Sequence, residues 1–345
     1  MTDQLPIEFG IDTFGDVTAD DNGVVLSQAQ VLRNIVAQGV LADKVGLDFI
    51  GIGEHHRDDF AVTAPEIVLA AIASVTERIH LGTAVTVLSS DDPIRVFQRF
   101  ATLDGISNGR AEVILGRGSF TESFPLFGFE LSQYEELFEE KVNLFSELIK
   151  EKPITWAGNT RAPLTDQQVF PFTESGTLTT WLGVGGSPES VVRAARYGLP
   201  LMLAIIGGEP ERFAPFVDLY HRALAQFGMP TTPVGVHSPG HIADTDEQAR
   251  EELWPHYLKL VTRIGRERGW SPMTREQFEH EAEVGSIYVG SPETVAQKIA
   301  KTMKALGNQR FDLKYANGTL SHEKLMRSIE LYGTVVAPRV RELLA

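Results

Sequence analysis

Short runs of apolar residues alternate along the chain with longer segments in which apolar residues recur every three or four positions. Eight short runs have the composition of parallel strands that are buried on both faces. These runs cover residues 7–11, 49–52, 79–85, 112–115, 181–184, 201–206, 234–237 and 311–314. The longer segments have the spacing of amphipathic helices and cover residues 27–45, 65–76, 93–106, 134–149, 188–197, 212–227 and 249–268.

The regular alternation of strand and helix, without a polar linker, favours one domain over residues 1–345. Eight strands and roughly 250 core residues match a single (β/α)8 barrel, the TIM barrel. The rest of the 345 residues would then form insertions at the carboxyl-end loops. We assign these insertions to residues 119–133, 152–179 and 269 to about 307. Two doubly wound domains are the alternative fold.

Composition and charge exclude several kinds of partner. The chain has 31 basic and 46 acidic residues, a formal net charge of −15, which repels nucleic acid and anionic membrane surfaces. It contains no cysteine, so disulfides and thiolate chemistry are excluded. The first residues, MTDQLPIEFG, lack the basic and apolar parts of a signal peptide, and no apolar run approaches the ~20 residues of a membrane span. We therefore expect a cytoplasmic protein.

The most titratable cluster follows directly after the second strand, in IGIGEHHRDDF. Active sites of (β/α)8 barrels are built from the loops after the strands, which places Glu54, His55 and His56 at the mouth of the barrel. Neighbouring side chains of an extended backbone point to opposite faces, so one of the two histidines should reach the mouth. That histidine could be a general base or a hydrogen-bond donor to a cofactor. Alternatively, both histidines bind neighbouring loops.

A zinc site is the rival interpretation of the histidines. Adjacent histidines do not match the HExxH motif, in which the two imidazoles share one helix face. His237 and His241 are four residues apart, but Pro239 and Gly240 lie between them and disfavour a helix. We therefore predict no metal site.

Two glycine-containing turns are candidates for phosphate binding. In GVGGSPES, a strand runs into Gly185 and Gly186, and Pro188 occupies the first position of the next helix. Backbone N–H groups and serine hydroxyls at such a helix start suit a phosphate, although a simple turn with a serine N-cap explains the pattern equally well. In ILGRGSF, Arg117 lies between two glycines, where it could bind a phosphate or a neighbouring carboxylate.

Small residues mark two further strand ends. GTAV, residues 82–85, would let a flat ligand approach the backbone closely, and AIIGG, residues 204–208, could shape a pocket floor. Core packing explains both stretches equally well. The aromatic residues Phe120, Phe124 and Phe127 would suit an apolar substrate if their loop covers the mouth, or they could pack the insertion onto the barrel.

Three stretches together resemble the luciferase-like flavin monooxygenase family, which includes bacterial luciferase: DFIGIGEHHRDDF, ERIHLGTAVTVLSSDDPIRVFQRFATLDGISNGRAEVILGRG and GVGGSPESVVRAARYGLPLML. The resemblance runs in order from about residue 7 to 335. It implies a (β/α)8 barrel that binds FMN at its carboxyl-end mouth. It also implies a homodimer formed by the helices at 65–76 and 93–106.

The resemblance assigns roles to individual residues. It implies that His55 lies at the reacting edge of the flavin as base or hydrogen-bond donor, with Glu54 and His56 as orienting neighbours. It also implies a non-proline cis peptide between Ala84 and Val85, on the strand beside the flavin ring. The residues that it assigns to the cofactor are Thr83, Ala84, Val85, Arg117, Gly185, Gly186, Ser187 and Ser190.

The sequence departs from bacterial luciferase at two positions. Gly116 replaces a reactive cysteine, and Glu135 replaces an arginine that partners the phosphate arginine. Luminescence is therefore not expected. The loops at 119–133, 156–179 and 269–290 would set the substrate, which the sequence does not identify.

The activity that the resemblance implies is oxidation of a small organic substrate by O2 and reduced FMN, which a separate flavin reductase supplies. One alternative is an oxidoreductase that transfers hydride with the deazaflavin F420. The other is a flavin-binding protein without catalytic activity.

Overall fold

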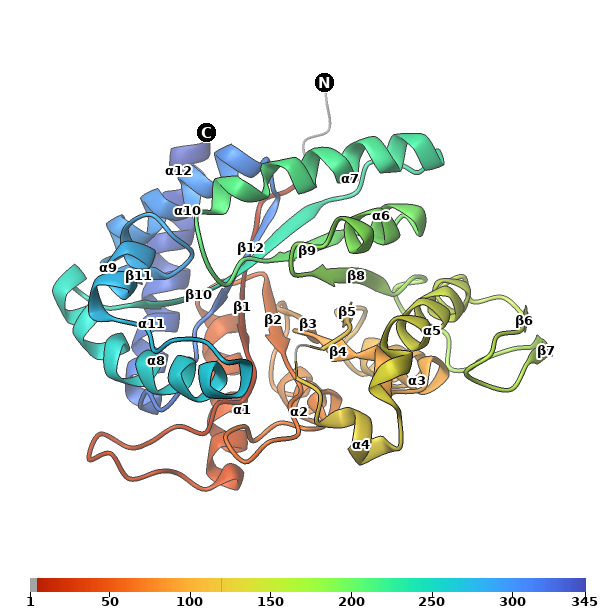
Figure 1. The fold of residues 1–345 in the computed structure, drawn as a ribbon, viewed down its shortest axis with the longest axis horizontal. Coiled ribbons are helices and arrows are strands. Elements are labelled where there is room, and N and C mark those ends of the chain that lie inside the picture. Colours follow the sequence, from red (N-terminus) through yellow and green to blue (C-terminus); the bar gives the residue numbers. More distant parts are fainter. Residues whose placement is uncertain (1–4, 119) are drawn as a thin grey trace.

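The strands form a mostly parallel sheet that is nearly closed into a barrel, with helices around it (Figure 1). The structure, a computed structural model, describes residues 5–118 and 120–345. Residues 1–4 of the N-terminal stretch and Ser119, the first residue of the predicted insertion 119–133, lie outside the described residues. The barrel strands are β1 (Glu8–Thr13), β2 (Phe49–Ile52), β3 (His80–Thr83), β5 (Glu112–Gly116), β8 (Thr179–Val184), β9 (Leu201–Ala204), β10 (Val234–Ile242) and β12 (Arg310–Lys314). The predicted barrel is confirmed.

Strand pairing follows the order of the chain, except where the last strand returns to the first. β1 pairs in parallel with β2 and with β12, so that Gly10 lies opposite both Phe49 and Asp312. The short strand β4 (Thr86–Val87) follows β3 and pairs with β5. The seam between β3 and β5 is closed by a bridge from Leu81 to Ala111.

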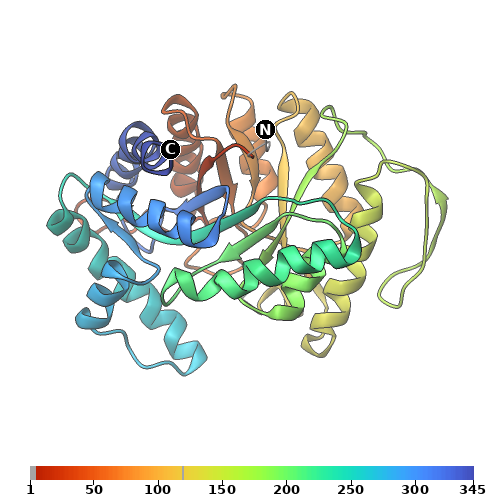
Figure 2. The same cartoon turned by 90° about the horizontal axis from the view of Figure 1, so that it is seen from above.

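The helices cover the outside of the sheet (Figures 1 and 2). The predicted helices are present as α1 (Gln28–Lys44), α2 (Pro65–Ala73), α3 (Pro93–Ile106), α5 (Tyr134–Leu148), α6 (Pro188–Arg196), α7 (Ala214–Phe227) and α8 (Asp246–Arg268). Further helices are α4 (Ser123–Phe127), α9 (Arg275–Glu283), α10 (Pro292–Leu306), α11 (His322–Leu331) and α12 (Ala337–Leu344). Short helical turns are η1 (Leu88–Ser90), η2 (Leu131–Gln133), η3 (Pro210–Phe213) and η4 (Tyr332–Val336). No helix among the described residues is long and apolar enough to cross a membrane.

The ends of α1 follow from its flanking residues. The Ser27 side chain accepts a hydrogen bond from the amide of Gln30, which satisfies a free N–H group of the first turn. Gly46, just past the last residue, adopts a φ of 81°, which glycine tolerates without strain. A serine N-cap and a glycine past the last turn therefore define the two ends of α1.

The predicted insertion at 152–179 is confirmed up to the start of β8, whereas the one from 269 to about 307 needs correction. Residues 152–179 contain an antiparallel hairpin, β6 (Ile154–Trp156) and β7 (Leu164–Gln167), which projects from one side of the molecule (Figure 2). The segment from 269 to about 307 is an insertion only in its first part, which contains α9 and the strand β11 (Tyr288–Gly290). Its second part is α10, which packs on α12 and β11. Apolar residues of α10 recur at helical spacing, and Ser291 and Pro292 mark its start.

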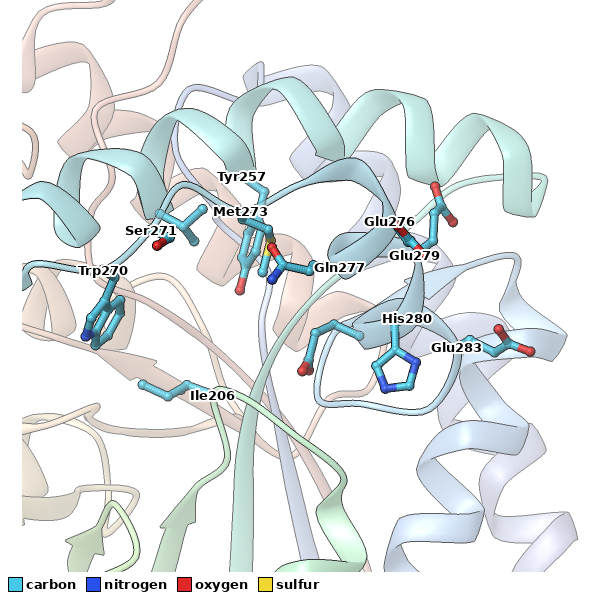
Figure 3. A pocket seen from close by; sticks show the side chains of 12 residues that line it. Ile206, Tyr257, Trp270, Ser271, Met273, Glu276, Gln277, Glu279, His280 and Glu283 are labelled. Atoms are coloured by element: carbon cyan, nitrogen blue, oxygen red, sulfur yellow. The ribbon is translucent and has the colours of Figure 1, made fainter.

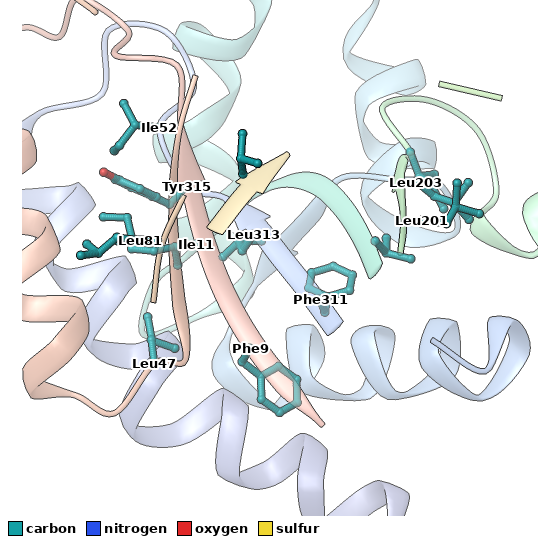
Figure 4. Packing of buried hydrophobic residues seen from close by; sticks show 14 of the residues in the cluster. Phe9, Ile11, Leu47, Ile52, Leu81, Leu201, Leu203, Phe311, Leu313 and Tyr315 are labelled. Carbon is teal, nitrogen blue, oxygen red and sulfur yellow. The ribbon is translucent and has the colours of Figure 1, made fainter. Parts of the chain in front are cut away.

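Side chains along β1 and β12 point alternately towards the apolar core beside the helices and towards the barrel interior. Phe9, Ile11, Phe311 and Leu313 belong to the large apolar core beside the helices (Figure 4). The rings of Phe9 and Tyr332 meet edge to face at 6.4 Å. Because strand side chains alternate, the strand residues between these core residues face the barrel interior.

The barrel interior holds a buried arginine. Arg310 is 1% exposed, and its guanidinium carbon lies 3.5 Å from the ring centre of Phe49 and 5.0 Å from that of Trp181. Its Nη1 donates to Glu112 at 2.7 Å and its Nε donates to Asp312 at 3.0 Å. This layer forms the floor beneath the carboxyl ends of the strands.

Candidate active site

The strand ends bring the predicted site residues to one end of the barrel. A cis peptide joins Ala84 to Val85, between β3 and β4, and so confirms the prediction of its position. The amide of Ala84 donates to the carbonyl of Ile52 at 3.0 Å, which places the cis peptide beside the loop that carries His55. Thr83 is fully buried, and its hydroxyl lies 3.0 Å from that of Thr86, so its side chain faces the protein interior.

Glu54 ties the histidine loop to β4. One carboxylate oxygen accepts from the amide of Val87 at 3.3 Å, and the other lies 3.4 Å from Nε2 of His56. Glu54 is 8% exposed. The resemblance implied that Glu54 and His56 orient His55. The two residues contact each other, and no hydrogen bond from Glu54 to His55 is present among the described residues.

His55 is enclosed by aromatic rings. Its ring centre lies 4.9 Å from Phe14, 4.5 Å from Phe60 and 4.7 Å from Phe120. The backbone N–H of His55 donates to Val62, but the buried Nε2 has no hydrogen-bond partner among the described residues.

Burial keeps the His55 imidazole neutral. Loss of hydration lowers its pKa to about 3, and the charges of Lys314 and Arg57 act in the same direction. A neutral imidazole can accept a hydrogen bond at one ring nitrogen and donate at the other. The unpartnered Nε2 is therefore available for a ligand, because a buried polar atom without a partner costs stability.

A cavity of about 150 Å³ opens beside these rings, and we call it the mouth pocket. Its apolar wall includes Phe14, Phe60 and Phe120, three rings that also surround His55. Phe120 therefore lies at the mouth, as one of the two interpretations of its loop predicted. Phe124, in contrast, is fully buried and stacks on Tyr134, and Phe127 contacts His56.

The polar side chains that line the mouth pocket include His237 of β10 and Lys314 of β12. Nδ1 of His237 lies 2.6 Å from Oδ2 of Asp12. Nζ of Lys314 lies 3.3 Å from both Asp16 and Asn317. His237 and Lys314 each have a polar partner, so the pocket offers a few fixed polar groups in an apolar wall, which is the usual composition of a small-molecule site.

His237 and His241 each contact a different carboxylate, in place of the shared zinc ion that the rival interpretation requires. His237 binds Asp12, and Nε2 of His241 lies 2.8 Å from Glu252. The part of the chain that the structure describes has no group of three or more His, Asp and Glu side chains arranged to hold a metal ion.

A wider hollow of about 750 Å³, which we call the outer groove, adjoins the mouth pocket. The two share Ile206, Tyr257, Val261 and Trp270. Figure 3 shows Trp270 and Ile206 at one end of the outer groove and His280 at the other. The rest of its lining comes mainly from α9 and the segment before it, so the insertion at 269–290 shapes the approach to the mouth pocket.

The predicted phosphate residues directly follow two neighbouring strands. Arg117 follows β5, and the turn with Gly185 and Gly186 follows β8, which pairs with β5. Gly186 has a φ of 105°, a conformation that glycine adopts readily, and a Cβ at Gly185 would meet open space. Ser187 caps α6 by accepting from the amide of Ser190 at 3.3 Å, as the simple-turn interpretation also predicted.

A chain of contacts links Arg117 to Ser190. Arg117 pairs with Glu135 of α5, and Glu135 also accepts from Nη2 of Arg193 at 3.2 Å. Nη1 of Arg193 lies 3.5 Å from the Ser190 hydroxyl. Arg117 therefore forms the carboxylate pair that its sequence context offered as an alternative, and it does so beside the predicted phosphate turn.

Sequence reasoning missed two features of the site. Arg193 lies three residues after Ser190, a spacing that places both on one helix face, and this signal could have identified it. The pair formed by Asp12 and His237 joins residues 225 positions apart and gives no signal in the sequence.

The residues at the strand ends fit a phosphorylated flavin. The unpartnered Nε2 of His55 can bind a polar ring atom, and the open space over Gly185 leaves room beside Arg117 and Ser190. Around the cis peptide, neighbouring side chains fill the space over the glycines, and a Cβ at Gly82 would lie 2.7 Å from the ring of Phe49. This packing supports the core-packing interpretation of residues 82–85.

Comparison with known proteins supports the same interpretation. The family model described as luciferase-like monooxygenase matches residues 11–310. The alkanal monooxygenase alpha chain of Photorhabdus laumondii is 24% identical over 359 residues, which cover 92% of this chain and 94% of that protein.

Two solved structures share the fold. One is the FMN complex of the oxygenating constituent of 3,6-diketocamphane monooxygenase from Pseudomonas putida, with a TM-score of 0.78 and 19% identity over 97% of this chain and 99% of that chain. The other is the F420-dependent tetrahydromethanopterin reductase of Methanopyrus kandleri, with a TM-score of 0.73 and 18% identity over 97% and 100%. The first of these structures contains FMN, and the second is of an F420-dependent enzyme.

Proposed function

Because the chain belongs to the luciferase-like monooxygenase family, we propose that it is a flavin-dependent monooxygenase that oxidises a small organic substrate with O2 and reduced FMN. The observation that carries this proposal is the state of His55. A neutral, buried imidazole with an unpartnered Nε2 stands behind the wall of the mouth pocket. It follows β2, whose last residue, Ile52, accepts a hydrogen bond from Ala84 of the cis peptide.

We assign the flavin ring to the wall formed by Thr83, Ala84 and Val85. Its phosphate would be held by Arg117, the serine hydroxyls at the start of α6, and the backbone N–H groups of the Gly185–Gly186 turn. When bound, reduced FMN supplies the electrons for the reaction of O2 with the substrate.

His55 and the aromatic rings would serve this chemistry in two ways. The imidazole would donate or accept one hydrogen bond at the reacting edge of the flavin without taking up a positive charge near neutral pH. Phe14, Phe60 and Phe120 would keep water away from that edge, since their rings already surround His55. The predominantly apolar mouth pocket suits a small apolar substrate with one or two polar groups.

A separate reductase would supply the reduced flavin. The neighbour from Pseudomonas putida is itself described as the oxygenating constituent of its monooxygenase, which supports this division of labour. We further propose that residues 1–345 act as one cytoplasmic domain.

We propose a homodimer formed through α2 and α3. Ile67 on α2 is 73% exposed. Val75, just past the end of α2, and Ile106, the last residue of α3, are also exposed. Exposed apolar side chains on adjacent helices favour a protein contact. Light scattering of the purified protein tests this proposal, and a monomer at micromolar concentration would contradict it.

F420-dependent hydride transfer is the second candidate function. The acidic side chains around Arg117 favour F420 over FMN. The phosphate of F420 is a diester with one negative charge, which these side chains suit better than the doubly charged phosphate of FMN. The likeness to an F420-dependent reductase supports the same alternative.

An anaerobic titration with reduced FMN, followed by rapid mixing with O2 while the flavin spectrum is recorded, tests the proposal. We expect saturable binding and a rate of flavin oxidation that differs from that of free FMN. His55→Asn should change that rate at least about tenfold while altering the dissociation constant much less. His221→Asn, at an exposed site on α7, is the matched control and should change neither value.

The other outcomes distinguish the alternatives. Failure to bind reduced FMN, combined with binding of F420, would favour hydride transfer. Binding of FMN with an unaltered reaction with O2 would favour a flavin-binding protein without catalytic activity. Equal rates for the native protein and His55→Asn would remove His55 from the proposed role.

A further inference from the structure

Glu135 lies between the two arginines nearest the proposed phosphate position. Its Oε1 pairs with Nη1 of Arg117, and its Oε2 accepts from Nη2 of Arg193 at 3.2 Å. The two arginines come from different segments, the loop after β5 and helix α6. One carboxylate of α5 thus joins both cations.

Further carboxylates neutralise the rest of this cluster. Glu139 accepts from Nε of Arg193 at 2.5 Å and from Arg196 at 3.1 Å. Glu189 accepts from the Ser187 hydroxyl at 2.8 Å. Three acidic side chains therefore accompany Arg117, Arg193 and Arg196. Sites that prefer a doubly charged phosphate gain affinity from an excess of positive charge. The three carboxylates remove that excess here.

A guanidinium offers the same pair of donors to a carboxylate and to a phosphate, so the two anions compete for it. The Glu135 side chain is 61% exposed and can turn towards solvent, whereas that of Arg193 is 10% exposed and held by Glu139. A phosphate that reaches Arg117 would therefore displace Glu135 and leave Arg193 in place.

We infer that Glu135 determines how strongly the site selects for the charge of the cofactor phosphate, by competing with that phosphate for Arg117 and Arg193. This inference rests on the proposed function, because it assumes that the site binds a flavin. Glu135 weakens the preference for a phosphate monoester over a ligand with less negative charge in the same position.

Two commercially available ligands isolate this effect. FMN carries a phosphate monoester, and riboflavin has the same ring and ribityl chain without the phosphate. The ratio of their dissociation constants measures how much the phosphate adds to binding, and quenching of flavin fluorescence or calorimetry gives both constants without any substrate. Because both ligands have the same ring, any effect of a variant on binding of the ring changes both constants equally and cancels in their ratio.

Glu135→Gln keeps the shape of the side chain and removes its charge. We expect the preference for FMN over riboflavin to rise about fivefold, the effect of one partly exposed ion pair. Glu135→Arg should raise it roughly twentyfold, because it removes a negative charge and adds a positive one. The FMN affinity of both variants should depend more steeply on salt than that of the native protein.

Glu136→Gln is the matched control. Glu136 is the next residue on α5 and is exposed, and its carboxylate accepts from the side chain of Asn159 at 3.1 Å, away from the arginines. This variant has the same net charge as Glu135→Gln, so an unchanged preference would show that the effect is local. Circular dichroism and thermal unfolding of all three variants would confirm that they are folded.

The failures of the inference and of the proposed function are distinguishable. An unchanged or reduced preference for FMN in Glu135→Gln, in a protein that binds riboflavin, would overturn the inference alone. An equal rise in Glu136→Gln would also overturn it. If neither the native protein nor Glu135→Arg binds FMN or riboflavin in either redox state, the flavin proposal fails and the inference fails with it.

Discussion

The side chain of Val85 lies against the bare backbone of Gly116, so closely that a Cβ atom at position 116 would be 2.3 Å from Cγ2 of Val85. A Cβ atom at Gly183 would be 3.0 Å from the other methyl group of Val85, and one at Gly51 would be 2.9 Å from the Cβ of Ala84. Three strands thus omit a side chain where the cis peptide lies. The position of the proposed flavin wall depends on these glycines.

Gly116→Ala should move Val85 and so disturb the flavin wall. A forced contact of this kind in a packed interior costs about 1–3 kcal/mol of unfolding free energy. We expect chemical denaturation to show that loss and flavin titration to show weaker binding. Gly207→Ala is the control, since a Cβ there meets no atom within 4 Å. Equal stability and affinity for both variants would contradict the role of Gly116.

The low pKa of His55 predicts that the folded protein loses stability in acid. Burial lowers the pKa of His55 in the folded protein to about 3, whereas in the unfolded chain it is near 6.5. Between these values only the unfolded chain takes up the proton, so stability decreases as the pH falls below 6.5. From pH 7 to pH 5 this amounts to about 2 kcal/mol.

His55→Gln should remove that part of the acid loss. Urea denaturation of both proteins at pH 8, 7 and 5 measures it. The difference in unfolding free energy between the two proteins should stay nearly constant from pH 8 to pH 7 and shift by about 2 kcal/mol in favour of the variant by pH 5. An unchanged difference over the whole range would show that the folded protein protonates His55 readily.

The barrel strands were predictable because parallel strands buried on both faces give short apolar runs. The predicted runs at 49–52 and 93–106 coincide with β2 and α3. The hairpin strand Leu164–Gln167 was missed, because its side chains are largely exposed and no apolar run marks it. α10 was missed for a different reason: its spacing and its Ser–Pro start were present in the segment that we assigned to an insertion.

The sequence indicated where the residues of the candidate site lie along the strands, but not which side chains surround them. The residue pattern placed His55 at a strand end, and the resemblance to the family implied the cis peptide between Ala84 and Val85. The sequence could not indicate the rings around His55, which come from three separate loops, or that Glu135 contacts Arg193. Such contacts depend on how distant segments pack.

Lys298 holds the insertion beside the outer groove. Its Nζ donates to the carbonyls of Glu281, Ala282 and Ile287 at 3.0, 2.7 and 2.8 Å. Lys298→Met removes these bonds and leaves the carbonyls without their donor, a loss of about 1–3 kcal/mol. We expect faster hydrogen exchange at residues 281–287, measured by mass spectrometry.

Lys301→Met on the same helix is the control for Lys298. Lys301 is 68% exposed and pairs with Glu211 on the surface, so its loss should cost less than about 1 kcal/mol. If both variants leave exchange at residues 281–287 unchanged, Lys298 does not hold the insertion in place.

Arg310 should be essential for the barrel interior. Arg310→Met fills the space between Phe49 and Trp181 but leaves the Glu112 and Asp312 carboxylates buried without their cation, and such a break costs about 3–5 kcal/mol. Urea denaturation should show that loss. Arg327→Met, which removes a half-exposed arginine from its surface partners, should cost less than about 1 kcal/mol. Equal costs for the two variants would mean that packing around the Arg310 side chain, and not its charge, stabilises the floor of the site.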